Sequence, residues 1–247
     1  MQQLMSISVL MKKGWDIYIA NFQKFLIPIG IMLAPYVLYY LLLMYGGPQI
    51  TILMLILTAL MAIVNLWIGI VIIMMIDKLY KNQPIDINKI YEIAFKKIPS
   101  YLFIVILSSL IIIGGLILLI IPGIIFMVWY SFSIYITILE EKDNKGTAAL
   151  KASKNLVTGR WGATFWRLLL PALAVYLVIM IVVIILSYII SGGNFNLQSY
   201  NQTMIMNALS SLITLILMPL FVTFSVILYN NLKETKESQT TAPVQNQ

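Results

Sequence analysis

Residues 101–139 read YLFIVILSSLIIIGGLILLIIPGIIFMVWYSFSIYITIL and contain no charged residue. A helix needs roughly 20 apolar residues to cross a bilayer, so this run is too long for one crossing and suits two. Pro122-Gly123 is the expected turn, because proline lacks the amide of a helix interior and glycine tolerates a chain reversal. The run therefore predicts a hydrophobic hairpin with arms at residues 101–121 and 124–139.

Four more runs of this kind flank the hairpin, at residues 25–45, 50–76, 168–190 and 204–229. The chain is 61% hydrophobic and only 10% charged, with a mean hydropathy of +0.94. Soluble domains carry about 25% charged residues, so lipid is the expected solvent. The sequence predicts an all-α polytopic membrane protein with six transmembrane helices arranged as three hairpins.

The distribution of charge orients these spans. Every lysine and arginine lies in residues 1–24, 77–100, 140–167 or the segment after residue 229, whereas the connections at 46–49, 122–123 and 191–203 carry no charge. An even number of spans places all four charged segments on one side, and the positive-inside rule makes that side the cytoplasm. We expect a multi-pass protein of the cell (plasma or inner) membrane with both termini cytoplasmic.

Three charged segments show helical periodicity, at residues 7–24, 86–98 and 147–158, with Pro99 expected to end the second helix. The first has an apolar stripe that includes Met11, Trp15 and Tyr18. Each segment precedes a hairpin, so the chain is interpreted as three copies of one unit: amphipathic interfacial helix, span, turn, span. Residues 1–232 form a single domain in this interpretation, and the Thr-, Gln- and Ser-rich residues 233–247 are predicted to be a disordered tail.

Several function classes lose their usual residues. The chain has no cysteine and no histidine, which removes thiolate nucleophiles, Cys/His zinc sites and imidazole acid–base chemistry. We found no phosphate-cradling glycine pattern and no nucleophile–base pair, and we expect no enzyme activity, catalytic residue, cofactor or metal site. Glu140, Glu141 and Asp143 are interpreted as a solvated acidic loop. The net charge of +7 indicates anionic lipid headgroups rather than nucleic acid, since no soluble domain carries it.

Two sets of residues are candidates for binding. Asn65 and Asn207 are polar residues within spans, expected either to hydrogen-bond a neighbouring helix or to line a path for a ligand. No ionisable residue lies near a predicted midplane, which counts against a proton-coupled pump. Asp77 and Arg167 lie at span ends, where snorkelling to the headgroups explains them. The interfacial candidates are basic and tryptophan residues near the cytoplasmic surface: Lys12, Lys13, Trp15, Lys96, Lys97, Arg160, Trp161, Trp166 and Arg167.

Short motifs connect the chain to a known family. They are IIPGII at residues 120–125, ALKAS at 149–153, TGRW at 158–161 and KGWDIY at 13–18 followed by Asn21-Phe22. The chain resembles the glycerophosphodiester phosphodiesterase membrane-domain family and related uncharacterised prokaryotic six-span families. The resemblance implies the fold and the membrane location. It transfers no catalytic residue, because no stretch of this sequence could supply the soluble phosphodiesterase domain for which the family is named.

Three functions follow in order of preference. The first is a non-catalytic membrane module that engages lipids, a partner membrane protein or a second copy of itself at the cytoplasmic leaflet. The second is a transporter or channel for a small or amphipathic solute, which internal repetition and proline-broken spans favour. The third, a lipid-modifying enzyme, ranks last because the catalytic side chains are missing. A polar cavity between the helices is the observation that favours the second function.

Overall fold

The computed structural model describes residues 4–45, 50–140, 146–193 and 200–240, and within these ranges the chain folds into nine α-helices and no strand. Six of the helical segments are long and apolar enough to cross a membrane. Helices suit lipid because each satisfies its backbone hydrogen bonds internally. The predicted all-α class is confirmed, and the six apolar helices fit an integral membrane protein. The predicted turn at residues 46–49 lies outside the described residues.

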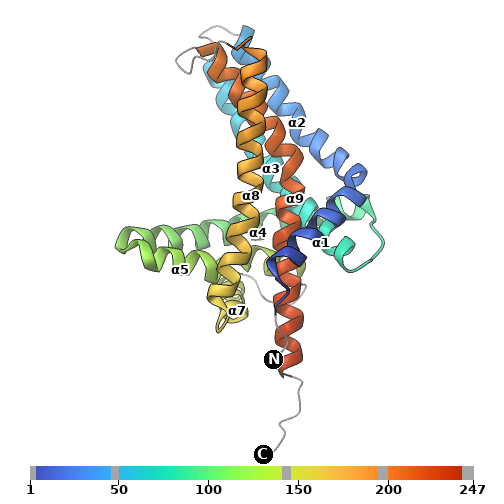
Figure 1. The fold of residues 1–247 in the computed structure, drawn as a ribbon, viewed down its shortest axis with the longest axis vertical. Helices are drawn as coiled ribbons and strands as arrows, with labels where there is room; N and C mark the ends of the chain where they lie inside the picture. Colours follow the sequence, from blue (N-terminus) through green and yellow to red (C-terminus); the bar gives the residue numbers. More distant parts are fainter. Residues whose placement is uncertain (1–3, 46–49, 141–145, 194–199, 241–247) are drawn as a thin grey trace, which may run out of the picture.

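Four long helices form an upright bundle: α2 (Phe22–Tyr45), α3 (Thr51–Tyr80), α8 (Trp161–Ile190) and α9 (Tyr200–Thr240) (Figure 1). They pair as α2 with α3 and α8 with α9, and α9 also packs against α2 and α3. The upper parts of all four helices are uncharged, so the described charges lie toward the lower end. The last turns of α9 include residues 233–240, where a disordered tail was predicted, and residues 241–247 lie outside the described part.

Helix α1 (Ile7–Ala20) packs against the lower part of α9. Ser6 caps it by accepting a hydrogen bond from the amide of Val9. Its buried residues are Leu10, Gly14 and Tyr18, whereas Trp15 is exposed. The buried face is thus rotated from the predicted stripe, because the close approach to α9 selects Gly14, where a Cβ atom would lie 2.4 Å from the Phe224 ring.

The second hairpin is built differently from the prediction. Helix α4 (Ile87–Leu118) begins after an Asp86 cap and continues through Pro99, so the prediction that Pro99 ends a separate interfacial helix is wrong. The chain reverses at Leu119, three residues before the predicted turn. Helix α5 (Ile120–Tyr130) then begins with Pro122 in its first turn, where the missing amide costs no hydrogen bond.

The predicted fourth span is broken into two helices. A junction at residues 131–132 separates α5 from the short helix α6 (Ser133–Leu139). Helix α7 (Thr147–Val157) follows, begins at the predicted residue, packs against both α5 and α6, and has Gly146 at its N-cap. The aromatic side chains of Phe132 and Tyr229 stack at the junction with α9.

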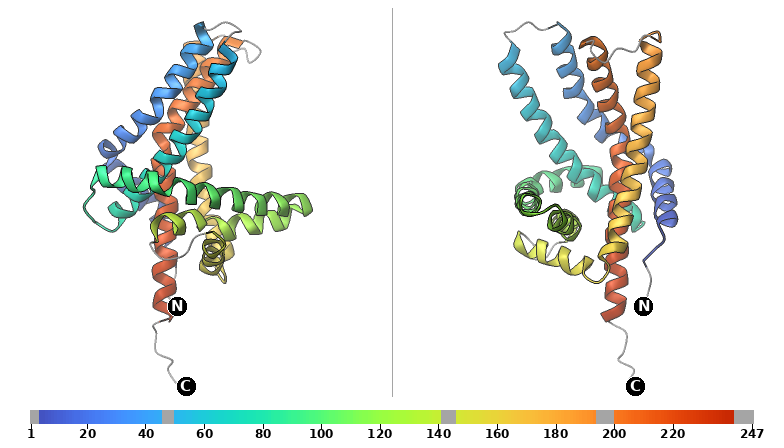
Figure 2. Two further views of the ribbon diagram at one scale, coloured as in Figure 1. Left: turned by 180° about the vertical axis from the view of Figure 1, so that it is seen from behind. Right: turned by 60° about the vertical axis from the view of Figure 1, so that its left-hand side comes forward.

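The hairpin of α4 and α5 runs crosswise to the bundle (Figures 1 and 2). It projects sideways from the lower part of the molecule, and a view along the hairpin shows the two helices end on beside the upright bundle (Figure 2, right). The arms touch through glycine: a Cβ atom at Gly123 would lie 2.4 Å from the Leu116 side chain and 2.8 Å from its amide nitrogen. The first and third groups each consist of a shorter helix followed by two long ones, α1–α3 and α7–α9. The second group departs from the predicted unit, because its interfacial segment and first arm form the single helix α4 and its second arm is divided into α5 and α6.

The core is concentrated in the lower half. Residues of α3 around Ile68, Ile72 and Ile76 are fully buried among α2, α6 and α9. A second cluster joins α1, α6, α7 and the lower part of α9 around Leu10, Phe132 and Leu228. The lower half is therefore tightly packed, and it positions the polar groups described next.

Candidate membrane-facing and intramembrane sites

A polar network lies inside the lower bundle. The carboxylate of Asp77 on α3 is buried, and it accepts a hydrogen bond from Nδ2 of Asn230 on α9 at 2.9 Å. Its other oxygen lies 2.8 Å from Nζ of Lys81. Asp77 was expected to snorkel to the headgroups, but it instead ties α3 to α9. A buried carboxylate needs such partners to offset the loss of water. We therefore assign Asp77 a structural role and not a ligand-binding one.

A second polar cluster lies at the lower end of α9. Oε1 of Glu140 accepts hydrogen bonds from the Tyr229 hydroxyl and from Nζ of Lys233, both at 2.8 Å. The cluster borders a cavity of about 310 Å³ that Lys236 and Glu237 also line. Glu140 is thus paired rather than solvated, and the rest of the predicted acidic loop, Glu141 and Asp143, lies outside the described residues.

Arg160 and Arg167, two predicted headgroup contacts, bind protein. Nη1 of Arg160 donates to the Thr235 hydroxyl at 2.6 Å, and partial burial lowers the pKa of its guanidinium. Nε of Arg167 donates to the carbonyl of Met5 at 2.8 Å, and Nη1 donates to the carbonyl of Ala163 at 2.8 Å. These arginines hold the N-terminal segment and the end of α9 against α8, since the planar guanidinium can serve several acceptors.

Lys97 and Trp161 also make internal contacts. Nζ of Lys97 donates to the carbonyl of Ile138, which connects α4 to α6. The indole Nε1 of Trp161 donates to the carbonyl of Ile125 at 3.3 Å, which connects α8 to α5. The Trp161 bond holds the crosswise hairpin against the bundle, and the Lys97 bond ties the hairpin to α6. The position of these two residues at span ends did not indicate either role.

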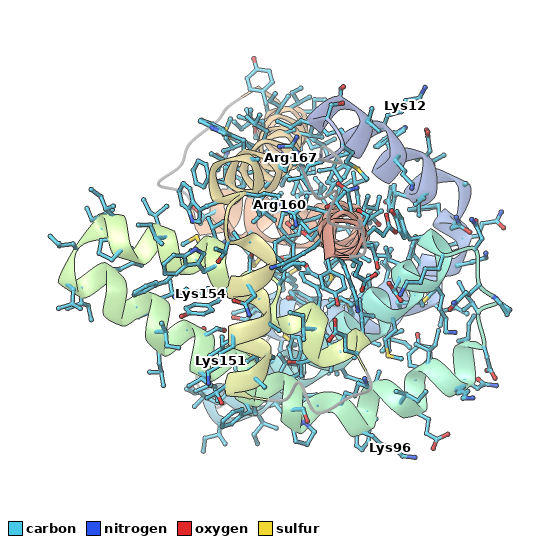
Figure 3. The ribbon with its side chains drawn as sticks, turned by 90° about the horizontal axis from the view of Figure 1, so that it is seen from below. Lys12, Lys96, Lys151, Lys154, Arg160 and Arg167 are labelled. Carbon is cyan, nitrogen blue, oxygen red and sulfur yellow. The ribbon has the colours of Figure 1, made fainter. Side chains whose placement is uncertain are left out.

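The remaining interfacial candidates face outward. Lys12, Lys96, Trp15 and Trp166 are exposed, with Trp15 and Trp166 about half exposed at 51% and 52%. Lys13 lies over the Tyr80 ring, 4.0 Å from its centroid. Seen from below, Lys12 and Lys96 lie at opposite sides of the molecule, while Arg160 and Arg167 lie nearer the middle (Figure 3). The outward-facing candidates on α1, Lys12 and Trp15, therefore do not share a site with Lys96 on α4.

Ser153, the last residue of the ALKAS motif, was not among the predicted site residues. It is fully buried on α7, and its hydroxyl donates to the carbonyl of Trp129 at 2.6 Å and accepts from the amide of Phe132 at 3.2 Å. These two groups belong to the break between α5 and α6. Nζ of Lys154, the next residue, lies 4.3 Å from the centroid of the Trp129 ring. The pattern of residues in α7 contained no signal for this break.

The two intramembrane asparagines have different surroundings. Nδ2 of Asn65 donates to the carbonyl of Met61 at 2.7 Å and to the Tyr36 hydroxyl at 3.4 Å, so Asn65 connects α3 with α2. Asn207 is exposed on α9 and lines a cleft of about 560 Å³ in the upper half of the bundle. The structure joins the two positions through Tyr36, which contacts Asn65 and lines the same cleft.

Comparison of the chain with protein-family models, with curated proteins and with solved structures found no match. The resemblance to the glycerophosphodiester phosphodiesterase membrane-domain family therefore stays a prediction. The six apolar helices fit an integral membrane protein, and its activity has to be argued from the sites themselves.

Proposed function

We propose that this integral membrane protein is a non-catalytic module that engages lipids of the cytoplasmic leaflet, and that its α4–α5 hairpin lies within that leaflet, parallel to the membrane plane. The observation that carries the proposal is the crosswise direction of the hairpin at the charged end of the bundle (Figure 1). An in-plane hairpin adds no crossing. The number of crossings is then four, which is still even and leaves every charged segment on the cytoplasmic side.

The surface of the hairpin is suited to contact with lipid chains. From residue 98 to residue 139 it has no charged residue, and its tip is the most exposed apolar segment among the described residues. Ile117 and Leu118 are 79% and 78% exposed, and Ile121 is 72% exposed. A contiguous apolar surface of this kind is rare on proteins in water, so lipid chains are the surroundings that it fits.

The dimensions agree with one leaflet. The hydrocarbon core of a bilayer is about 30 Å thick, so one leaflet contributes about 15 Å. A helix with its side chains has a diameter of about 10–12 Å, and a single layer of two helices therefore fits within that depth. The hairpin meets the upright helices near Trp161 in the first turn of α8, and Arg167 follows within two turns on the same helix.

Cations lie beneath the hairpin. Helix α7, which packs against α5, carries the exposed Lys151 and Lys154 on the lower face, and Lys96 lies near the start of α4 (Figure 3). Each basic residue near an anionic leaflet contributes about 1 kcal/mol to binding. In this arrangement the apolar hairpin contacts the lipid chains and the lysines beneath it contact the anionic headgroups of the cytoplasmic leaflet.

Cysteine accessibility tests the proposal directly, because the chain has no cysteine of its own. Leu119→Cys places one thiol at the tip of the hairpin. We expect a membrane-impermeant maleimide to leave it unlabelled from either side of intact membranes and to label it after detergent is added. Ser191→Cys at the upper end of α8 is the control for the outer side, and Lys89→Cys on α4 is the control for the cytoplasmic side.

Both other outcomes overturn the proposal. Labelling of Leu119→Cys from outside would mean that the hairpin crosses the bilayer as two spans. Labelling from the cytoplasmic side would mean that the tip lies in water or against a soluble partner. A nitroxide attached at the same position adds a depth measurement, for which we expect high accessibility to oxygen and low accessibility to a water-soluble nickel complex.

The second candidate function is a carrier for a small or amphipathic solute. The cleft near Asn207 favours it, because this cleft has hydroxyl and amide side chains in its lining and lies between α2 and α9. The residues that would bind such a solute lie on α2 and α9, away from the hairpin.

A further inference from the structure

We infer that the cleft between α2 and α9 in the upper half of the bundle binds an amphipathic molecule with an uncharged, hydroxyl-rich head group. The site lies away from the crosswise hairpin and goes beyond the engagement of cytoplasmic lipid. The inference rests on two adjoining cavities that share lining residues, one with a partly polar lining and one with an apolar lining.

The first cavity is partly polar, with the apolar side chains of Leu43, Met204 and Leu215 beside its polar groups. It has a volume of about 560 Å³, within the range of small-molecule sites. Its lining from α2 is dominated by tyrosine and its lining from α9 by hydroxyl and amide side chains: Tyr36, Tyr39, Tyr40, Asn207, Ser210 and Thr214. All of these are uncharged, which sets the class of ligand. An ionised head would have no counter-charge here, whereas sugar-like hydroxyls find both donors and acceptors.

Several of these polar side chains are uncommitted. Among the described residues, no hydrogen bond uses the side chains of Tyr39, Asn207, Ser210 or Thr214. Polar groups at membrane depth are costly when they face lipid chains, because hydrocarbon offers no partner. A head group with several hydroxyls would satisfy this whole set at once.

The second cavity is apolar. It has a volume of about 350 Å³ and is lined mainly by Leu33, Val37, Leu41, Met44, Ala208 and Leu212. Tyr36, Tyr40 and Ser211 line both cavities. The Tyr40 hydroxyl and the Ser211 hydroxyl lie 3.0 Å apart in a hydrogen bond, so this pair forms the boundary between them. A head on one side of the boundary and an alkyl chain on the other describe an amphipathic ligand.

Tyr36 is held in place from behind. Its hydroxyl accepts from Nδ2 of Asn65, which is itself anchored to the carbonyl of Met61. Asn65 does not line either cavity, so it is a positioning residue. Its contact orients a phenol that both cavities share.

The cleft is closed from below. Leu215 forms part of its lining and is buried, and the Tyr18 hydroxyl donates to the carbonyl of Ile216 at 2.9 Å one residue further down α9. The fully buried α3 residues Ile68 and Ile72 lie in the core cluster that includes Leu215. Access is therefore from the upper end or sideways from the lipid between α2 and α9.

Photoaffinity labelling tests the site. The probe is an alkyl glucoside with a diazirine in its chain, added to the protein in phosphatidylcholine nanodiscs. Two matched probes carry the same chain with a phosphate or a trimethylammonium head. We expect the glucoside to crosslink residues 33–44 of α2 and 208–212 of α9, with excess octyl glucoside competing, and the charged probes to label these segments roughly tenfold less, equivalent to one lost interaction of ordinary strength.

Variants separate this site from general lipid contact. Asn207→Leu removes an uncommitted amide, so it should fold normally and reduce glucoside crosslinking about tenfold. Thr58→Leu is the control, since Thr58 is exposed on α3 and bonds only the carbonyl of Met54. Equal labelling by all three probes, labelling spread over the lipid-facing helices, or no effect of Asn207→Leu would each overturn the inference. None of these outcomes depends on where the α4–α5 hairpin lies.

Discussion

The Ser153 hydroxyl on α7 accepts a hydrogen bond from the amide of Phe132, at 3.2 Å, in the break between α5 and α6. The same hydroxyl donates to the carbonyl of Trp129 at 2.6 Å, so one side chain serves both of these backbone groups. Backbone groups freed by a broken helix are expensive when they are buried, because no water replaces the lost partner. The break in the second arm of the hairpin is therefore stabilised from outside the arm.

Ser153→Ala should destabilise this junction. The substitution removes one donor and one acceptor and leaves the backbone groups of Trp129 and Phe132 without that partner, at a cost of about 1–3 kcal/mol. The melting temperature in detergent micelles measures the effect. Thr158→Ala is the control, because that hydroxyl bonds only the carbonyl of Lys154 at an exposed position. Equal melting temperatures for both variants would contradict the role assigned to Ser153.

Gly123→Ala should force apart the two arms of the hairpin. Its Cβ atom would meet the Leu116 backbone nitrogen at 2.8 Å, and backbone cannot move aside cheaply. Overpacking of this kind costs about 1–3 kcal/mol. Gly114→Ala is a matched control one helix away, since a Cβ atom there would have no neighbour within 4 Å.

The measurement for this pair is the distance between spin labels placed on the two arms. We expect the distance to lengthen in Gly123→Ala and to stay unchanged in Gly114→Ala. An unchanged distance between the spin labels in both variants would show that the arms do not meet at Gly123.

Asn230→Leu should destabilise the lower bundle. The substitution removes the amide that donates to the buried Asp77 carboxylate, and hydrogen bonds to charged groups contribute about 1.5–3 kcal/mol. Thermal unfolding in micelles gives the change. Glu92→Gln, which breaks an exposed ion pair with Lys96, should leave the melting temperature unchanged. A similar decrease in melting temperature in the two variants would mean that the hydrogen bond to Asp77 stabilises the protein no more than the exposed ion pair does.

Arg167→Lys should release the N-terminal segment although the charge is kept. Lysine lacks the planar fork that reaches the carbonyls of Met5 and Ala163 together. Losing about 1–2 kcal/mol corresponds to roughly 5–30-fold faster opening, which hydrogen–deuterium exchange at residues 5–10 reports. Lys96→Gln is the control on the exposed lower face. Unchanged exchange in Arg167→Lys would show that Asn231, which accepts from the Met5 amide, holds the segment alone.

Hydropathy predicted the helical class and the positions of the long apolar segments because lipid leaves the backbone few alternatives. The same reasoning placed the reversal at Pro122-Gly123, whereas the chain turns at Leu119 and uses Pro122 in the next helix. Both arrangements satisfy the rules for proline, so composition could not choose between them. Nor could hydropathy reveal the crosswise direction, since an apolar helix has the same composition along the membrane plane as across it.

The candidate sites were predictable only in part. Asn207 was recognised as an intramembrane polar residue, but the tyrosines that face it come from α2, and only the packing of distant helices brings them together. Arg160, Arg167 and Trp161 were recognised as interfacial, yet the protein groups that they bind lie on other elements. Pairwise contacts of this kind depend on tertiary structure, which periodicity along one helix does not encode.

The sideways hairpin also sets how near another protein can come. Residues 101–118 of α4 have a length of about 27 Å at the usual rise per residue. A neighbour approaching the bundle on that flank meets the arm first, unless it lies above or beneath it (Figure 2). Copies of this chain that associate through the upright helices on that flank must therefore pack above or beneath the arm, and otherwise they associate through the opposite flank.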